Sequence, residues 1–584
     1  MNSSFIKGHN LTTQYDIKKD DIVLGISSYL HDSSVCFLCN GKILYASQEE
    51  RHTRIKNDSS FPFLSLLEGL DYLNLDKKII KNIVFHESLE WISKKKKQKI
   101  KDRLSSDLSF IGFKNFNLNF LDHHYSHAAA GYYSSSFKDA LIFTFDGMGE
   151  TVSTSVFHGK NNHLKNIKKI HEPNSLGLLY SAFTYFLGFD VNSGEYKMMG
   201  LSPFGKSIYE NKIFSELVNV FEDGSFKIND KYFNFMGNKE IITKELEKFF
   251  LIKKRNKNDK ILNIHCDIAA SIQSVIEKII FKIIRFEIEK HETSNIVLGG
   301  GVALNCVANG KIEKLFKKNI HIFPSPGDSG NAYGCAAFAT FASYENINLE
   351  RSKIKDIFVG SSYKKNSQEI IYLCKIFDLN YHEFSDYKEI VDLLINQKII
   401  GFFAERSEFG PRSLGNRSII ADPRNSDAQK KINLKIKFRE SFRPFAPIVL
   451  KEFVKEYFED CEESPYMQKT YYLKSDKLIN NNLKTKDIFE KINEERSLFP
   501  AITHVDNSAR VQTISNKDLP IYKLLNEFYS VTGCPMLVNT SFNVNNEPIV
   551  ETPFDAMKTF INTNLDYLII NNLIISKKKN VSKF

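Results

Sequence analysis

From about residue 21 to about residue 345, short apolar runs alternate with longer amphipathic stretches. The first runs predict a strand that begins near Asp21, a second over Val35–Cys39 and a third over Ile43–Ala46, with Asn40-Gly41 as a hairpin turn. Farther along, Asp267–Ile280 has the apolar spacing that is typical of an amphipathic helix. Strands and helices that alternate in this way predict an α/β fold with a largely parallel sheet.

The pattern changes near residue 345, where the polar stretch Glu345–Lys355 is typical of a connection between domains. A new unit begins near Phe358, and Lys398–Phe403 is its clearest strand. We therefore expect two domains, over residues 21–350 and 356–575. A chain of 584 residues is long enough for each domain to bury a core of its own.

Two histidines stand four residues apart at the start of an alanine-rich run that favours a helix. The segment Asn117–Phe120 alternates like a short strand, and Asp122 is a natural N-cap, so His123 and His127 should share one face of the first helical turns. This arrangement suits a metal. The pattern argues against a zinc peptidase of the His-Glu-x-x-His type, because His124 stands where the glutamate would be, and an isolated pair of this spacing could equally pack or form hydrogen bonds without a metal.

Two aspartates follow strand-like runs farther along the chain. Asp146 ends the apolar run that starts at Leu141, and Asp328 lies in the loop Ser325–Gly334. Two imidazoles and two carboxylates form a ligand set that fits Fe(II), Mn(II) or Zn(II), and the residues alone do not choose among these ions.

Two glycine-containing loops are candidates for phosphate binding. Gly299–Asn305 lies between a predicted strand and a helix, so backbone amides near Gly300 could approach a nucleotide, with Asn305 facing it. Gly200–Ser207 matches the Walker A pattern, but no apolar strand precedes it and a proline interrupts its amides. We interpret Ser193–Gly205 instead as an active-site loop that carries Glu195 and Lys197.

Basic residues of the second domain stand on loops shaped by glycine, proline and phenylalanine. Guanidinium groups held in this way suit phosphate or carboxylate recognition, so we expect an anion site there, although any single member could form only a surface ion pair. The members are Arg412, Arg417, Arg424, Lys437, Arg439 and Arg443. Two later strand-like runs, Thr503–Gln512 and Pro535–Asn543, end in hydrogen-bonding groups and complete the domain.

Composition narrows the classes of partner. The net charge of +10 comes with lysine spread along the chain, so we rank nucleotides and phosphates above nucleic acid as partners. The eight cysteines are scattered, which predicts reduced thiols and a cytoplasmic location, and we place both Cys36 and Cys39 in the core. We expect neither a secretion signal nor a membrane span.

Eight linked motifs, in order and over roughly residues 21 to 570, give the sequence a specific family resemblance. It resembles the NodU/CmcH family of O-carbamoyltransferases. The motifs are His123–His127, Asp146–Gly149, Lys197–Gly205, Gly300–Asn305, Gly327–Gly334, Glu408–Ser418, Phe442–Pro447 and Asn539–Asn543.

The resemblance implies an N-terminal domain with the actin-like ATPase fold, similar to the metal-binding domain of tRNA threonylcarbamoyl transferases, and a YrdC-like α/β C-terminal domain. It also implies a reaction in two steps. Carbamoyl phosphate and ATP form carbamoyl adenylate and pyrophosphate with Mg(II) at the C-terminal site. The adenylate then passes internally to the metal domain, where an acceptor hydroxyl takes the carbamoyl group and AMP leaves. The enclosed passage protects the reactive anhydride from water.

The resemblance also assigns residues by motif. The expected iron ligands are His123, His127, Asp146 and Asp328, and the bound metal would fix the nucleotide's phosphate. The expected contacts to carbamoyl phosphate and ATP are Arg412, Lys437, Arg443, Arg510 and Asn539.

Our candidate for the general base that activates the acceptor hydroxyl is His31, which could equally be a core histidine. The first strand departs from nucleotide-hydrolysing actin-like proteins, since Leu24–Ser28 lacks their Asp-x-Gly-Thr motif. Phosphate handling in this domain would then depend on the metal and the glycine loop.

The sequence is also compatible with two other functions. A tRNA threonylcarbamoyl transferase would share the metal domain, but the fused anion-binding domain favours a self-contained route to a small molecule. A non-catalytic nucleotide-binding regulator would need neither the metal ligands nor the arginine-rich loops. We expect a small-molecule or sugar acceptor, which the sequence does not identify, and no nucleic acid or membrane partner. A homodimer is expected only because it is the commonest oligomer.

Overall fold

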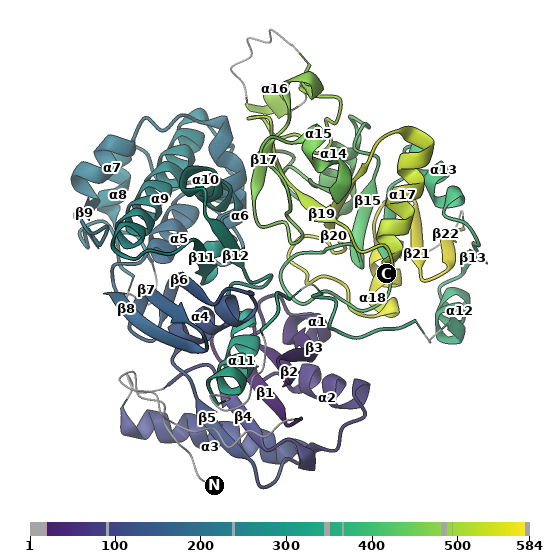
Figure 1. The fold of residues 1–584 in the computed structure, drawn as a ribbon. Helices are drawn as coiled ribbons and strands as arrows, with labels where there is room; N and C mark the ends of the chain where they lie inside the picture. The colour runs from purple at the N-terminus through teal and green to yellow at the C-terminus, as the bar shows by residue number, and fades with distance from the viewer. Residues whose placement is uncertain are drawn as a thin grey trace. The chain divides into compact units, whose positions relative to one another are not determined.

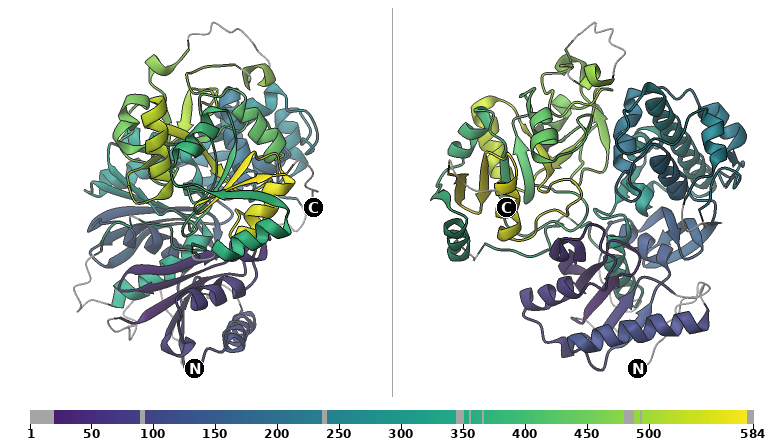
Figure 2. Two further views of the ribbon diagram at one scale, coloured as in Figure 1. Left: turned by 90° about the vertical axis from the view of Figure 1, so that its right-hand side faces the viewer. Right: turned by 180° about the vertical axis from the view of Figure 1, so that it is seen from behind.

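The structure is a computed structural model that describes residues 20–88, 93–235, 240–343, 351–354, 356–364, 367–479, 488–492 and 494–578. The chain forms two compact units (Figures 1 and 2). Unit 1 holds Met1–Thr53, Asn57–Asn305 and Lys311–Val359, and unit 2 holds Arg54–Lys56, Cys306–Gly310 and Gly360–Phe584. Much of the predicted connection at 345–358 lies outside the described residues.

Unit 1 contains two five-stranded sheets. The first has the order β3-β2-β1-β4-β5, and the second has the order β12-β11-β6-β7-β8. The strands of the first sheet are β1 (Ile22–Ser27), β2 (Ser34–Cys39), β3 (Lys42–Gln48), β4 (Asn82–Phe85) and β5 (Asn117–Phe120). Those of the second are β6 (Asp139–Gly149), β7 (Val152–Lys160), β8 (His163–His171), β11 (Asn295–Gly299) and β12 (Asn319–Ile322).

The two sheets have the same topology. In each, the first three strands form an antiparallel meander, and two parallel strands follow on the other side of the first strand. This duplicated α/β arrangement is the actin-like fold that we predicted. The sheets are mixed rather than largely parallel, because tight turns can join only antiparallel neighbours. Asn40 and Gly41 make the predicted turn, with φ of 48° and 74°.

Helices α4 (His123–Tyr133) and α11 (Asn331–Ser343) pack against each other inside unit 1. α11 contacts β1, β2 and β4 of the first sheet, and α4 contacts β6 and β11 of the second (Figure 1). A Cβ on Gly334 would lie 2.0 Å from the carbonyl oxygen of Ser126, so the close approach of the two helices requires glycine there. The outer face of the first sheet is covered by apolar residues of α2 (Phe63–Tyr72) and α3 (Lys94–Ile111).

The remaining helices of unit 1 include the predicted amphipathic one, which is longer than expected as α9 (Asn263–Lys290). The Walker-like segment folds as α6 (Glu195–Leu201) and a short 3-10 turn, η2 (Ser202–Phe204), with no strand before it, which confirms that it is not a P-loop. The others are α1 (Glu49–Thr53), α5 (Leu176–Phe186), α7 (Glu210–Glu216) and α8 (Lys244–Phe250), beside the short strands β9 (Val218–Val220) and β10 (Phe226–Ile228).

Unit 2 is built on an eight-stranded sheet with the order β13-β22-β21-β14-β15-β20-β16-β19. The apolar strands β14 (Ile400–Phe403) and β16 (Ala446–Leu450) are fully buried, as expected of a sheet covered on both faces. The strands are β13 (Leu379–Glu383), β14 (Ile400–Phe403), β15 (Arg417–Ala421), β16 (Ala446–Leu450), β19 (Gln512–Ile514), β20 (Met536–Ser541), β21 (Tyr567–Ile570) and β22 (Leu573–Lys577).

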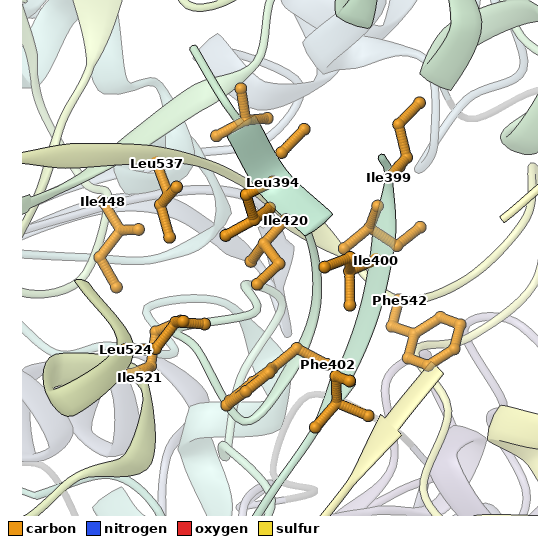
Figure 3. Packing of buried hydrophobic residues seen from close by; sticks show 14 of the residues in the cluster. Leu394, Ile399, Ile400, Phe402, Ile420, Ile448, Ile521, Leu524, Leu537 and Phe542 are labelled. Atoms are coloured by element: carbon orange, nitrogen blue, oxygen red, sulfur yellow. The ribbon is translucent and has the colours of Figure 1, made fainter. Parts of the chain in front are cut away.

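Two amphipathic helices, α13 (Lys388–Ile395) and α17 (Pro520–Thr532), contribute apolar side chains to the core of unit 2. Figure 3 shows Leu394 of α13 and Ile521 and Leu524 of α17 among strand residues such as Ile420 and Ile448. The unit also contains α12 (Ser367–Ile376), α14 (Ala428–Lys431), α15 (Val454–Tyr457), α16 (Ile488–Ile492), α18 (Pro553–Asn562) and the strand pair β17 (Thr470–Tyr472) and β18 (Ser508–Arg510).

Two further expectations can be compared with the fold. All eight cysteines are free, and Cys36 is buried, but Cys39 is partly exposed at the end of β2, so its predicted place in the core is wrong. Among the described residues, no helix combines the length and the apolar character needed to cross a bilayer.

Candidate functional site

The paired histidines occupy the N-terminal turns of α4, directly after β5. Asp122 caps the helix as predicted, since its carboxylate accepts a hydrogen bond from the backbone N–H of Tyr125 at 3.0 Å. His123 and His127 are buried, and their Nε2 atoms lie 3.1 Å apart. The helical spacing therefore aims both imidazoles at one point.

The two predicted aspartates reach the same point from other elements. Asp146 lies on β6, and Asp328 begins the short turn η4 (Asp328–Gly330) that leads into α11. An Asp146 oxygen lies 3.1 Å from Nε2 of His123, and an Asp328 oxygen lies 3.4 Å from Nε2 of His127. One donor atom from each of the four residues falls within 4.8 Å of all the others.

This spacing fits one divalent ion. Ligand atoms that surround an ion at about 2.0–2.2 Å are separated from one another by about 3 Å or slightly more. Imidazole nitrogens and carboxylate oxygens are also the donors that Fe(II), Mn(II) and Zn(II) share. The residues could therefore hold such an ion, and the donor set does not decide which.

The charges of the four residues are strongly linked. Burial opposes ionisation of both histidines and both aspartates, but the contacts between them outweigh it. The pKa of His123 is raised to about 10 by Asp328 and Asp146, and the pKa of His127 is raised by the same carboxylates. The pKa values of Asp146 and Asp328 are lowered in return.

The glycine turn after β11 is tied to this cluster. The amide of Gly301 donates to a carboxylate oxygen of Asp146 at 2.9 Å, and the amide of Gly300 donates to the carbonyl of Pro326 at 3.0 Å. Gly300 has φ of 83°, and a Cβ there would lie 2.2 Å from the carbonyl oxygen of Phe145. The turn thus positions Asp146, while the approach of Gly300 to a phosphate stays a prediction.

Asn305 follows the short turn η3 (Gly301–Leu304), at the start of α10 (Cys306–Phe316). Its side-chain amide exchanges two hydrogen bonds with Gln273 of α9, at 3.0 and 3.1 Å. Gln273 also donates to Glu277 and accepts from Tyr180, both at 2.8 Å. This buried network fixes the orientation of Asn305, and the predicted contact of Asn305 with a nucleotide is not tested by it.

Two further histidines border the four-residue cluster. Nε2 of His31 lies 3.5 Å from Asp328, and Nδ1 lies 3.1 Å from Asp32, so the predicted general base stands beside the cluster. Asp328 raises the pKa of His31 to about 10. His86 is fully buried, and burial followed by the charge of His123 lowers its pKa to about 3, so it is neutral at physiological pH.

Lys197, the other predicted catalytic residue, is buried on α6. Its neighbour on that helix, Glu195, accepts hydrogen bonds from the hydroxyl of Ser181 at 2.8 Å and from the amide of Asn192 at 3.1 Å. Glu195 therefore shapes the loop before the helix, and the catalytic role of Lys197 stays a prediction.

In unit 2, a buried glutamate shapes the arginine-rich loop. One carboxylate oxygen of Glu408 accepts hydrogen bonds from the amides of Leu414, Asn416 and Arg417 at 2.7 to 3.1 Å. A carboxylate that accepts several amides stabilises a tight loop conformation. Glu408 lies in the motif Glu408–Ser418, but we did not predict from the sequence that it shapes this loop.

The guanidinium of Arg417 is fully buried and bonded to the backbone. It donates to the carbonyls of Ala404 at 2.7 Å and Asn416 at 3.0 Å, with further bonds to carbonyls of neighbouring loops, and it lies over the ring of Phe403 at 3.7 Å from the centroid. The prediction that Arg417 contacts a ligand does not fit this geometry, because its donors are directed at the protein itself.

The predicted anion site takes a clearer form around Lys437. Its ammonium donates to the hydroxyl of Ser541 at 3.0 Å, to the side chain of Asn543 at 2.8 Å and to the carbonyl of Ser541. These acceptors are neutral. Burial, and then the charges of Arg439 and Arg443, lower the pKa of Lys437.

Other cations extend this cluster. The pKa of Arg439 is lowered by burial and by Arg443, and the pKa of Arg510 is lowered to about 9 by burial and by Arg412. Neighbouring cations that repel one another are stabilised by a bound anion. Because these cations affect one another's pKa, they lie close together. The members of the cluster are Lys437, Arg439, Arg443, Arg412 and Arg510.

Asn539 and Arg424 differ in their surroundings. Asn539 is buried on β20, donates to Gln512 at 2.7 Å and to the carbonyl of Ser413 at 3.3 Å, and so links the arginine-rich loop to the sheet. Arg424 instead forms an ion pair with Asp422 at 2.6 Å. This is the surface ion pair that we considered as the alternative to a place in the anion site. Gln512, Ser541 and Asn543 were missed as individual residues because single amides and hydroxyls carry little signal in sequence.

With the fold and the two clusters described, the chain can be compared with known proteins. The family model "Carbamoyltransferase N-terminus" matches residues 22–111 and 90–337, and "Carbamoyltransferase C-terminus" matches residues 391–577. The chain therefore belongs to the carbamoyltransferase family and is a carbamoyltransferase of the NodU/CmcH type.

Relatives match over most of the chain. It is 39% identical to the uncharacterized protein sll1178 of Synechocystis sp., over 95% of this chain and 96% of that protein. It is 30% identical to the nodulation protein NolNO of Sinorhizobium fredii, over 94% of this chain and 80% of that protein. Component A of (R)-2-hydroxyglutaryl-CoA dehydratase from Acidaminococcus fermentans is a solved structure with 15% identity and a TM-score of 0.33, over 56% of this chain and 99% of that chain. At this score the likeness adds nothing to the family assignment.

Metal affinity should rise steeply with pH, because the raised pKa values of His123 and His127 mean that an incoming ion must displace protons from both rings. We expect the affinity for Co(II) to increase by about tenfold to a hundredfold per pH unit between pH 6 and 8. Calorimetry in two buffers of different ionisation enthalpy measures the protons released. His158→Gln, a variant of a partly exposed histidine on β7, is the control. Binding that is independent of pH and releases no proton would contradict the prediction.

Replacing Arg417 should destabilise unit 2 rather than weaken ligand binding. Arg417→Met leaves several buried carbonyls without donors, so we expect the free energy of unfolding to fall by about 3–5 kcal/mol. Arg424→Met removes a partly exposed ion pair and should cost about 1 kcal/mol or less. Chemical denaturation followed by fluorescence measures both variants. A fully stable Arg417→Met protein that no longer binds ATP would show that Arg417 is a ligand contact after all.

Proposed function

We propose that the chain activates carbamoyl phosphate with ATP in unit 2 and transfers the carbamoyl group to an acceptor hydroxyl in unit 1. The observation that carries the proposal is that one chain holds two different clusters, a set of cations around the buried Lys437 and a set of two histidines and two aspartates. The first suits phosphate groups, and the second suits a metal-assisted transfer. The family assignment supports carbamoyl transfer in general.

The activation step fits the cation cluster. Water releases phosphate from carbamoyl phosphate and leaves carbamate, and a carbamate oxygen then attacks the α-phosphorus of ATP. The bond to the β-phosphate breaks, so carbamoyl adenylate and pyrophosphate form. Both substrates carry several negative charges, which Lys437, Arg439, Arg443, Arg412 and Arg510 would neutralise and orient, with Mg(II) bound to the ATP phosphates.

The transfer step fits the cluster in unit 1. The acceptor oxygen attacks the carbamoyl carbon, the bond to the AMP phosphate oxygen breaks, and the proton of the hydroxyl passes to a base. His31 is our proposed base, because it lies beside Asp328 at the edge of the cluster. A bound divalent ion would offset the charge of Asp328, lower the pKa of His31 toward neutrality and hold the nucleotide's phosphate.

No specific observation favours the alternative function, a tRNA threonylcarbamoyl transferase. We propose that the cation cluster of unit 2 gives the chain its own route from carbamoyl phosphate, which such an enzyme would not need. The acceptor is proposed as a small molecule or sugar with a free hydroxyl. The relatives named as nodulation proteins do not identify it.

Exchange of labelled pyrophosphate into ATP tests the activation step. We expect exchange only when carbamoyl phosphate is present, because pyrophosphate can re-form ATP only from the adenylate. His127→Ala should keep this exchange and lose carbamoyl transfer, since it removes one member of the cluster in unit 1. Lys437→Ala should lose the exchange by about a hundredfold or more.

Two outcomes would contradict this division of labour. An absence of exchange from the unsubstituted chain, with Mg(II) and metal supplied, would show that unit 2 does not activate carbamoyl phosphate. Transfer that survives in His127→Ala would remove the assignment of unit 1.

A further inference from the structure

One more polar side chain reaches the cluster of two histidines and two aspartates. Asn331 begins α11, and its side-chain nitrogen Nδ2 lies 3.4 Å from Nε2 of His127. The same Nε2 atom lies 3.3 Å from Asp146 and 3.4 Å from Asp328. The amide of Asn331 is therefore a neighbour of the ring nitrogen that also contacts both aspartates, at the tip of the ring where an ion would bind.

The turn before α11 explains the position of Asn331. Its backbone N–H donates to the carbonyl of Asp328 and closes the short 3-10 turn η4. In such a turn, side chains three residues apart project on the same side. The turn is also held from the first sheet, because the hydroxyl of Ser34 donates to the carbonyl of Ser329 at 2.7 Å. The backbone thus fixes Asn331 beside Asp328.

The amide of Asn331 has an unused acceptor. The residue is fully buried, and its Oδ1 atom has no hydrogen-bond partner among the described residues. A buried carbonyl oxygen without a partner is costly. A half-turn about the Cβ–Cγ bond exchanges Oδ1 and Nδ2. The oxygen can therefore take the position beside His127 with the loss of a single long hydrogen bond.

A bound ion would favour this exchange. When Nε2 of His127 coordinates a metal, its lone pair is used, and it can no longer accept an N–H group from Asn331. The N–H group would also point its positive end at the cation. After the half-turn, Oδ1 stands where Nδ2 now lies, 3.4 Å from Nε2. Two ligand atoms of one ion are separated by about 3 Å or slightly more, so the position fits a shared ion.

We propose that Oδ1 of Asn331 is a fifth protein ligand of the metal in unit 1. The proposal rests on the proposed function, which places a divalent ion among the two histidines and two aspartates. A neutral oxygen joins this set without changing its charge. Five ligands favour an ion that accepts five or six, such as Fe(II) or Mn(II), over Zn(II), for which four suffice. A six-coordinate ion would keep one position for an oxygen of the substrate.

Two substitutions of Asn331 test the ligand. Asn331→Leu keeps the branched shape of the side chain and removes its oxygen. Asn331→Asp keeps an oxygen in the same place and removes the N–H donors. The metal-free full chain and each variant are titrated in a calorimeter with Mn(II) alone or Zn(II) alone. The double variant with Asp146→Asn and Asp328→Asn measures the adventitious binding of each ion.

We expect Asn331→Leu to bind Mn(II) about tenfold to a hundredfold more weakly than the parent, while its Zn(II) affinity changes by no more than about threefold. Asn331→Asp should bind Mn(II) at least as tightly as the parent, because it still offers an oxygen. The matched control is Thr340→Val, which removes a buried hydroxyl that bonds to the carbonyl of Ala336 farther along α11. It should leave both affinities unchanged.

The outcomes separate this inference from the function on which it rests. Equal losses of Mn(II) and Zn(II) affinity in Asn331→Leu would show a purely structural role and overturn the inference. Unchanged Mn(II) binding in that variant, or weakened Mn(II) binding in Asn331→Asp, would overturn it as well. If Asn331→Leu does not fold by circular dichroism, the aspartate variant decides alone. A parent that binds neither ion more tightly than the double variant would instead contradict the metal centre of the proposed function.

Discussion

The structure of unit 1 depends on the mutual attraction of two buried imidazoles and two buried carboxylates. Each group alone would be expensive to bury, and only their contacts at 3.1 to 3.6 Å keep them charged. Such a cluster needs a rigid frame. The two sheets with one repeated topology provide it, because α4 from one and α11 from the other pack together and bring His123, His127 and Asp328 to the end of β6.

In unit 2 the constraint is the opposite one, because like charges lie close to one another. Its arginine-rich loop is held by groups that never need to touch a ligand, namely the carboxylate of Glu408 and the guanidinium of Arg417. Beside this loop, Lys437 donates to neutral groups of Ser541 and Asn543, and the charges of Arg439 and Arg443 lower its pKa. The proposed phosphate site thus consists of a cation cluster and of a separate set of charges that shapes the loop around it.

The sequence predicted much of this arrangement because the signals were local or repeated. The cap at Asp122, the spacing of His123 and His127 and the turn at Asn40-Gly41 are all determined within a few residues. Distant relations were predicted less well. The burial of Arg417 depends on carbonyls from three separate segments of the chain, which no local pattern in the sequence indicates. The mixed order of the sheets likewise follows from turns rather than from the period of single strands.

Metal analysis of the chain, purified without oxygen, tests most directly whether the four residues of unit 1 act as one site. We expect one transition-metal ion per chain, with X-ray absorption showing nitrogen and oxygen ligands at about 2.0–2.2 Å and no sulfur. The variant with both Asp146→Asn and Asp328→Asn should lose the ion and keep its fold by circular dichroism. A chain that transfers carbamoyl groups without a metal, or a double variant that retains the ion, would contradict the account.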